Sequence, residues 1–362
     1  MEDSKKLEPA LCYVPELLVD YLNKNNIRVL KPASFFMNGV CLLVDISGFT
    51  KLSEKFCDQG RSGIDDLQLA TNGFMGQLVD IIYTFGGDII KFAGDAIICV
   101  FSPDFTANNR RPVRRTSMGS FNPNDESSYL MNLESSSVEH SVSMNGQTTI
   151  PPEVVLRVML CAKLLTEVQT DKLTVHVAMS CGEMCFGVLG GFENRWECLI
   201  SGPCIHQLSG CLDDAPSKHA VMSRRCARIV RDALASIDSR PTEALTAGLD
   251  VMGGRYSFSI LPLPSKNVRI VSVSFAAVAS VFPVVEEKSV NKWDTKDRKK
   301  LINLFVPLPI ANQLEQGANL SYLAEIREVS TMFMKVRTNY FFVSSIINVH
   351  KVNSFFVAVG FL

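Results

Sequence analysis

The sequence has almost no net charge. Its 362 residues carry 36 Lys and Arg against 37 Asp and Glu, which gives a formal charge of −1 at pH 7. Nucleic-acid binding depends on a strong positive field, and this balance offers none. We therefore expect a protein that binds no nucleic acid.

Long hydrophobic runs are also missing. A helix needs about 20 apolar residues to span a bilayer, and the most apolar run, residues 271–285, is shorter and contains Ser and Pro. Residues 1–8 are polar and lack the apolar core of a secretory signal peptide. We expect a cytoplasmic protein with no membrane span.

The cysteines show no metal-binding or redox spacing. None of the 11 cysteines forms a CxxC pair, the spacing that zinc sites and redox dithiols use. Most lie inside apolar runs, as Cys41, Cys99 and Cys161 do. Buried, reduced thiols are the better interpretation, and they are typical of a cytosolic chain.

The apolar periodicity predicts a mixed α+β domain. The order strand–helix–strand–strand–helix–strand is that of the ferredoxin-like βαββαβ motif. Strands are expected at residues 38–45, 89–92, 96–101, 174–181, 183–189, 196–201 and 255–263, and helices at residues 50–56, 64–85, 153–167 and 224–236.

Composition divides the chain further. We predict an N-terminal segment at 1–29, a first domain at 30–265, a connector at 266–313, and the start of a second, similar domain at 314–362, with a helix at 314–326 and a strand at 329–336. Residues 103–152, rich in Ser, Asn, Arg and Pro, are interpreted as a disordered insertion in the first domain. Because the second domain is incomplete, we expect a fragment, a splice form or an imperfect gene model.

Two aspartates stand at the ends of predicted strands. Asp45 closes the first strand, and Asp95 lies in the turn between the two strands that follow. If these strands are neighbours, both carboxylates reach the same end of the sheet. Together with the backbone carbonyl of Ile46, they suit hard divalent cations such as Mg²⁺. An aspartate before Ser-Gly is also common as a turn or cap residue, so the residues alone leave both interpretations open.

The turn after Asp45 opens a predicted helix. Backbone N–H groups at a helix start can hold phosphate oxygens. Candidate phosphate-binding residues are Ser47, Gly48, Phe49 and Thr50.

Two strings carry a resemblance to a known family. LLVDISGFTKLSEKF, residues 42–56, and FGGDIIKFAGDAIICVF, residues 85–101, resemble the two signature segments of the class III nucleotidyl cyclases. The similarity is greatest to the first of the two catalytic halves of soluble adenylyl cyclases. It covers roughly residues 30–265 without the insertion, and it is looser at residues 175–203.

The resemblance implies conversion of ATP to cyclic AMP and pyrophosphate in intracellular signalling. Asp45 and Asp95 become the ligands of two Mg²⁺ ions, which Mn²⁺ can replace, and Ile46 supplies a carbonyl ligand. Phe49 and Thr50 flank the triphosphate. A guanylyl cyclase and an inactive regulatory cyclase-homology module remain alternatives.

The resemblance also implies a missing partner. In this family the second half supplies the purine-selecting Lys and Thr, the ribose-orienting Asn and the transition-state Arg. The segment PCIHQLSG after Gly202 holds neither Asn nor Arg. We therefore expect no catalytic residues here beyond the metal ligands, and activity only with a second cyclase half in the same or another chain.

Lys91, Ser117 and His176 are three further residues with a predicted role. Lys91 matches a lysine of the family's bicarbonate site, although the arginine of that site falls near Ser209 and an exposed hairpin lysine is the alternative. Ser117 follows Arg-Arg-Thr, a pattern for the cyclic-AMP-dependent kinase, and a solvated basic loop is the alternative. His176, within an apolar strand pattern, is interpreted as a packed core residue.

Overall fold

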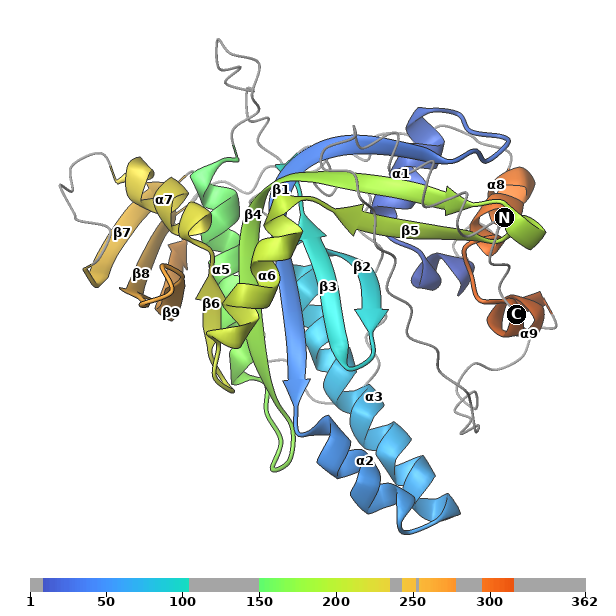
Figure 1. Ribbon diagram of the computed structural model, residues 1–362, viewed down its shortest axis with the longest axis horizontal. Helices are drawn as coiled ribbons and strands as arrows, with labels where there is room; N and C mark the ends of the chain where they lie inside the picture. The colour runs from blue at the N-terminus through green and yellow to red at the C-terminus, as the bar shows by residue number, and fades with distance from the viewer. Residues whose placement is uncertain (1–8, 104–149, 235–242, 252–253, 278–294, 316–362) are drawn as a thin grey trace, which may run out of the picture. The chain divides into compact units, whose positions relative to one another are not determined.

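The computed structural model forms two compact units. The smaller unit comprises Met1–Phe35, Cys185–Leu199 and Asn291–Leu362, and the larger comprises Phe36–Met184 and Ile200–Val290. Both candidate aspartates belong to the larger unit. The structure describes residues 9–103, 150–234, 243–251, 254–277 and 295–315 (Figure 1).

The first half of the larger unit has the ferredoxin-like strand order. Its four strands lie in the order β2-β3-β1-β4, with β3 antiparallel to both β1 and β2. Chain order and sheet order together define a split βαβ sheet, which confirms the α+β, βαββαβ prediction. The elements are β1 (Ala33–Ser47), α2 (Phe49–Cys57), α3 (Arg61–Thr84), β2 (Asp88–Ala93), β3 (Ala96–Phe101), α5 (Pro152–Glu167) and β4 (Thr174–Gly190).

Helices α3 and α5 form the core together with the sheet, as the sequence predicts. In α3, Phe74, Leu78 and Ile82 recur every four residues and are almost fully buried. Val155 and Met159 of α5 belong to the same cluster. Figure 1 shows both helices behind the strands, where they cover one face of the sheet.

Strand β4 corrects one prediction. The sequence suggested two strands divided at Gly182, but β4 continues through it. A Cβ atom at Gly182 would lie 3.0 Å from Arg225 Nη1. The glycine therefore leaves room for a side chain from another element and does not end the strand.

The sheet of the larger unit extends beyond β4. Strand β6 pairs parallel with β4, and β9, β8 and β7 follow as an antiparallel set. Strand β9 lies within the stretch interpreted as a connector and takes up part of the apolar run 271–285. The bounds are α6 (Pro203–Asp213), β6 (Ala220–Met222), α7 (Arg224–Ala233), β7 (Leu245–Val251), β8 (Gly254–Pro262) and β9 (Val268–Ala277).

The smaller unit gathers helices around a hairpin. Strand β5 (Trp196–Ser201) pairs with β4, and Arg195 Nη1 donates to the Val306 carbonyl at 2.8 Å. Phe35 stacks on Tyr21 and makes a tilted ring contact with Phe186. Its helices are η1 (Pro9–Tyr13), α1 (Glu16–Lys24), η4 (Phe192–Asn194), α8 (Thr295–Asn303) and α9 (Leu308–Glu315).

Several predictions fall on residues outside the described ranges. These are the strand at 329–336, most of the insertion at 103–152, Ser117, and the helix at 314–326 beyond Glu315. Within the part of the chain that the structure describes, no helix has the length and apolar character required to cross a bilayer.

The described cysteines are buried free thiols, as the sequence predicted. Burial raises the pKa of Cys204 to about 11 and that of Cys211 to about 12. Cys181 differs, because a hydrogen bond with Cys226 lowers its pKa, yet its side chain is fully buried. The set is Cys41, Cys99, Cys161, Cys181, Cys185, Cys198, Cys204, Cys211 and Cys226.

This burial predicts slow thiol chemistry in the native state. The thiolate is the reactive form, and a buried thiol neither ionises readily nor meets the reagent. Titration of the folded chain with Ellman's reagent is expected to label quickly no more than Cys12 and Cys57, the two outside that set. All 11 cysteines should react in guanidinium chloride. Rapid labelling of more than two thiols in the native chain would contradict the described packing.

Candidate functional site

The strand register brings the two candidate aspartates to one end of the sheet. The β1–β3 ladder runs from Val40 opposite Phe101 to Asp45 opposite Ala96. Asp95 directly precedes Ala96, so it follows the end of that ladder beside Asp45. Both residues are partly exposed. The strands are neighbours, as the sequence argument required.

A two-residue turn places Asp95. Strands β2 and β3 meet with Ala93 opposite Ala96, which leaves Gly94 and Asp95 as the turn. Gly94 has a φ of +68°, the conformation that glycine supplies at the first position of a type II′ hairpin turn. The predicted hairpin is thus confirmed.

A glycine connects Asp45 to the start of α2. Strand β1 extends through the buried Ile46 to Ser47, two residues further than predicted. Gly48 has a φ of +96°, and a Cβ atom there would collide with the Lys172 carbonyl oxygen. Only glycine therefore fits this turn.

The first turn of α2 offers backbone donors. Its first helical hydrogen bond runs from Leu52 N–H to the Gly48 carbonyl, 3.1 Å away. The N–H groups of Phe49 and Thr50 precede that bond and point out of the helix start. Phosphate oxygens are suitable acceptors for such groups.

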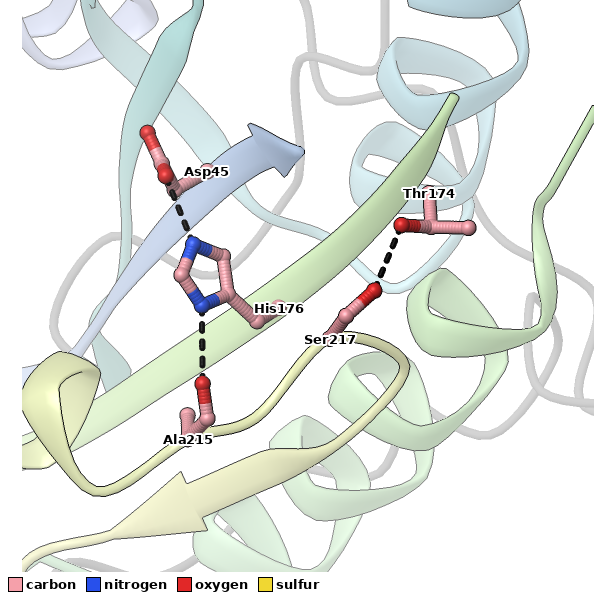
Figure 2. Close-up of polar contacts among 5 residues, drawn as sticks. All are labelled: Asp45, Thr174, His176, Ala215 and Ser217. Atoms are coloured by element: carbon pink, nitrogen blue, oxygen red, sulfur yellow. Dashed lines mark hydrogen bonds and ion pairs between the residues drawn. The ribbon is translucent and has the colours of Figure 1, made fainter. Parts of the chain in front are cut away.

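His176 contacts Asp45, which the sequence interpretation missed. Its Nε2 lies 2.6 Å from Asp45 Oδ2, and its Nδ1 lies 2.8 Å from the Ala215 carbonyl (Figure 2). A carbonyl only accepts, so Nδ1 carries hydrogen. Nε2 makes the hydrogen bond to the Asp45 carboxylate. The interpretation of His176 as a packed core residue holds only in part, because its side chain is 20% exposed at the start of β4.

The loop that carries Ala215 is fastened to β4. This loop follows α6 and leads into β6. The Ala215 carbonyl faces the His176 ring (Figure 2). The bonds that fasten it join Lys218 N–H to the Val175 carbonyl (2.8 Å), Val177 N–H to the His219 carbonyl (3.0 Å), and Thr174 Oγ1 to Ser217 Oγ (2.6 Å).

The oxygen atoms at this site suit an open magnesium site, in which the substrate completes the coordination. They do not form a site in which protein side chains supply all the ligands. Across the described ranges, no three His, Cys, Asp or Glu side chains converge to hold a metal. Asp45, Asp95 and the Ile46 carbonyl bring hard oxygen atoms to this end of the sheet, and these atoms could hold a metal. Mg²⁺ is commonly bound by one or two carboxylates plus substrate phosphates, so this incomplete set suits a metal–nucleotide complex.

The remaining candidates lie elsewhere in the larger unit. Lys91 is exposed on β2, opposite Ile98 and next to a β-bulge, and Ser209 is exposed on α6. A role for Lys91 in binding bicarbonate stays a prediction. Asp214, which is not a predicted site residue, follows α6 and accepts hydrogen bonds from Ser265 and Asn267.

Comparison with known proteins supports the family resemblance. No family model matches the chain. Its sequence is nevertheless similar to adenylate cyclases, and among these to adenylate cyclase type 10. The rabbit (Oryctolagus cuniculus) protein is 21% identical over 334 residues, which is 90% of this chain and 18% of the relative. The mouse (Mus musculus) protein is 38% identical over 94 residues, 25% of this chain and 6% of the relative.

The similarity to type 10 adenylate cyclases confirms the resemblance seen in the sequence. The chain spans only 18% of the length of the rabbit relative. Among solved structures, the adenylyl cyclase CyaB from P. aeruginosa aligns with a TM-score of 0.39 and 15% identity, over 66% of this chain and 96% of that one. The strand order of this chain itself defines the fold described above.

Proposed function

We propose that this chain contains the metal-donating half of a class III adenylyl cyclase. Paired with a second half, it converts ATP to cyclic AMP and pyrophosphate. The observation that carries the proposal is the register that sets Asp45 and Asp95 side by side next to the glycine turn before α2. The similarity to type 10 adenylate cyclases supports the choice of reaction.

The residues of this half have separate tasks. Asp45, Asp95 and the Ile46 carbonyl would hold two Mg²⁺ or Mn²⁺ ions, which supply activation of the ribose hydroxyl and neutralisation of phosphate charge. The N–H groups of Phe49 and Thr50 orient the triphosphate at the start of α2. The turn at Gly48, which only glycine fits beside the Lys172 carbonyl, sets the start of α2 directly after β1.

A second half is needed for the rest of the chemistry. Helix α6 begins at Pro203, and its first eight residues include neither Asn nor Arg. Donors and cations aimed at developing charge supply a large part of catalysis, and losing one costs about 3 kcal/mol or more. We propose that the partner half provides these groups, within a longer chain or from another one.

The cellular setting belongs to the same proposal. Nine described cysteines are buried free thiols, which suits a reducing compartment. We therefore propose a cytoplasmic enzyme of intracellular signalling.

A mixing experiment tests the function. The purified chain, alone and with the second catalytic half of a type 10 cyclase, would receive Mg-ATP, Mn-ATP and the matching GTP complexes. We expect cyclic AMP only from the mixture, because neither half alone holds all the catalytic groups. Chromatographic separation of the products would quantify both cyclic nucleotides.

The other outcomes select the alternatives. Cyclic GMP as the main product would identify a guanylyl cyclase. A folded chain without activity in either arm would identify a regulatory cyclase-homology module, the reading that the missing Asn and Arg favour. Activity of the chain alone, abolished by Asp45→Ala, would contradict the need for a partner.

A further inference from the structure

The Asp45 carboxylate is held from one side only. Among the described residues, its polar partner is His176, through the 2.6 Å contact between Oδ2 and Nε2. The Asp45 side chain is 29% exposed. The histidine contact therefore restrains a carboxylate that is partly open to solvent.

The His176 ring is itself fixed at both nitrogens. Nδ1 lies 2.8 Å from the Ala215 carbonyl, so the ring cannot turn without losing one of its two hydrogen bonds. The carbonyl belongs to a loop that three hydrogen bonds fasten to β4. Asp214, the neighbour of Ala215, is held in turn by Ser265 and Asn267.

We propose that His176 is a positioning residue for the candidate metal site. It fixes Oδ2 of Asp45 so that the second oxygen, Oδ1, is presented to a divalent cation. This inference rests on the proposed function, because it takes Asp45 as a metal ligand. Residues that hydrogen-bond to metal ligands typically contribute 10- to 100-fold to metal affinity.

Glutamine is the matched substitution for this role. Its side-chain amide can donate a hydrogen bond to Asp45 in place of Nε2, whereas alanine removes the contact.

Binding of Mn²⁺ alone provides the test. The free-ion signal in electron paramagnetic resonance would give the affinity of the purified full chain without nucleotide. We expect Asp45→Asn to abolish the site and His176→Ala to weaken Mn²⁺ binding about tenfold or more. His176→Gln should regain most of that loss. The matched control is His206→Ala, at an exposed position on α6, which should bind like the wild type.

The outcomes distinguish this inference from the function beneath it. If Asp45→Asn binds Mn²⁺ like the wild type, the metal site itself fails, and the inference fails with it. If Asp45→Asn loses the site but His176→Ala binds equally well or more tightly, only the positioning role is overturned. A glutamine variant as weak as alanine, with unchanged circular dichroism, would also overturn it.

Discussion

Replacing Asp95 with asparagine is expected to lower cyclic AMP synthesis by about a thousandfold, measured with a complementing second half and saturating Mn-ATP. The amide keeps the shape of the side chain and the hairpin turn but removes the charge that a divalent cation requires. A metal ion at a phosphoryl group is worth several kcal/mol of transition-state stabilisation, and about 4 kcal/mol corresponds to this loss. The initial rate of product formation at a fixed concentration of the partner half measures it.

The control for Asp95→Asn is the same change at an exposed aspartate. Asp213 lies at the end of α6, and Asp213→Asn should leave the rate within about twofold because surface substitutions have small effects. A loss below tenfold in Asp95→Asn, with the thermal midpoint unchanged, would show that this carboxylate holds no essential ion.

A large loss of stability is expected for Gly48→Ala. Its φ of +96° costs an alanine about 1–2 kcal/mol, and the new Cβ must also displace the Lys172 carbonyl. Overpacking of this kind typically adds about 1–3 kcal/mol. We expect the free energy of unfolding to fall by about 3 kcal/mol. Urea denaturation followed by circular dichroism would measure the change.

Gly94→Ala is the control that measures the cost of a positive φ without a steric clash. Gly94 also has a positive φ, +68°, but nothing lies within 4 Å of the position that its Cβ would take. The expected loss is therefore about 1 kcal/mol, the cost of the left-handed conformation alone. Equal losses in the two variants would mean that the Lys172 backbone moves aside without cost.

The sequence could predict those elements whose signals are local. The hairpin of β2 and β3 follows from two short apolar runs around a glycine turn, and α3 follows from its four-residue stripe. The break at Gly182 was wrong because a glycine ends a strand or continues it according to what packs against it. Here the Arg225 side chain decides, and it lies more than 40 residues further along the chain.

Strand β9 was missed for a similar reason. Residues 271–277 belong to the apolar run that is too short to span a membrane, and residues 268–270 lie in the predicted connector. The alternation of buried Val268, Ile270 and Phe275 is only partial. The strand is defined by its partners β6 and β8, which the local pattern does not contain.

The candidate site also has one part that the sequence could predict and one part that it could not. Asp45 and Asp95 could be proposed from strand ends, turn residues and the family resemblance. The contact of His176 with Asp45 joins residues 131 positions apart, and an apolar strand pattern favours packing for any residue within it. The signal that could have revealed this contact is the position of the histidine in its strand. A histidine near the start of one strand can lie beside the end of a neighbouring strand.

The β1–β3 register determines which mutations this site can accumulate over evolution. Side chains alternate along a strand, so a slip of one residue would move every side chain of the slipped strand to the opposite face of the sheet. The relative position of the two carboxylates is therefore set by the same ladder that pairs the core residues, from Val40 opposite Phe101 to Asp45 opposite Ala96. An insertion or deletion several residues from Asp95 would therefore move its carboxylate relative to Asp45, whereas a substitution on the surface of the hairpin leaves the register unchanged.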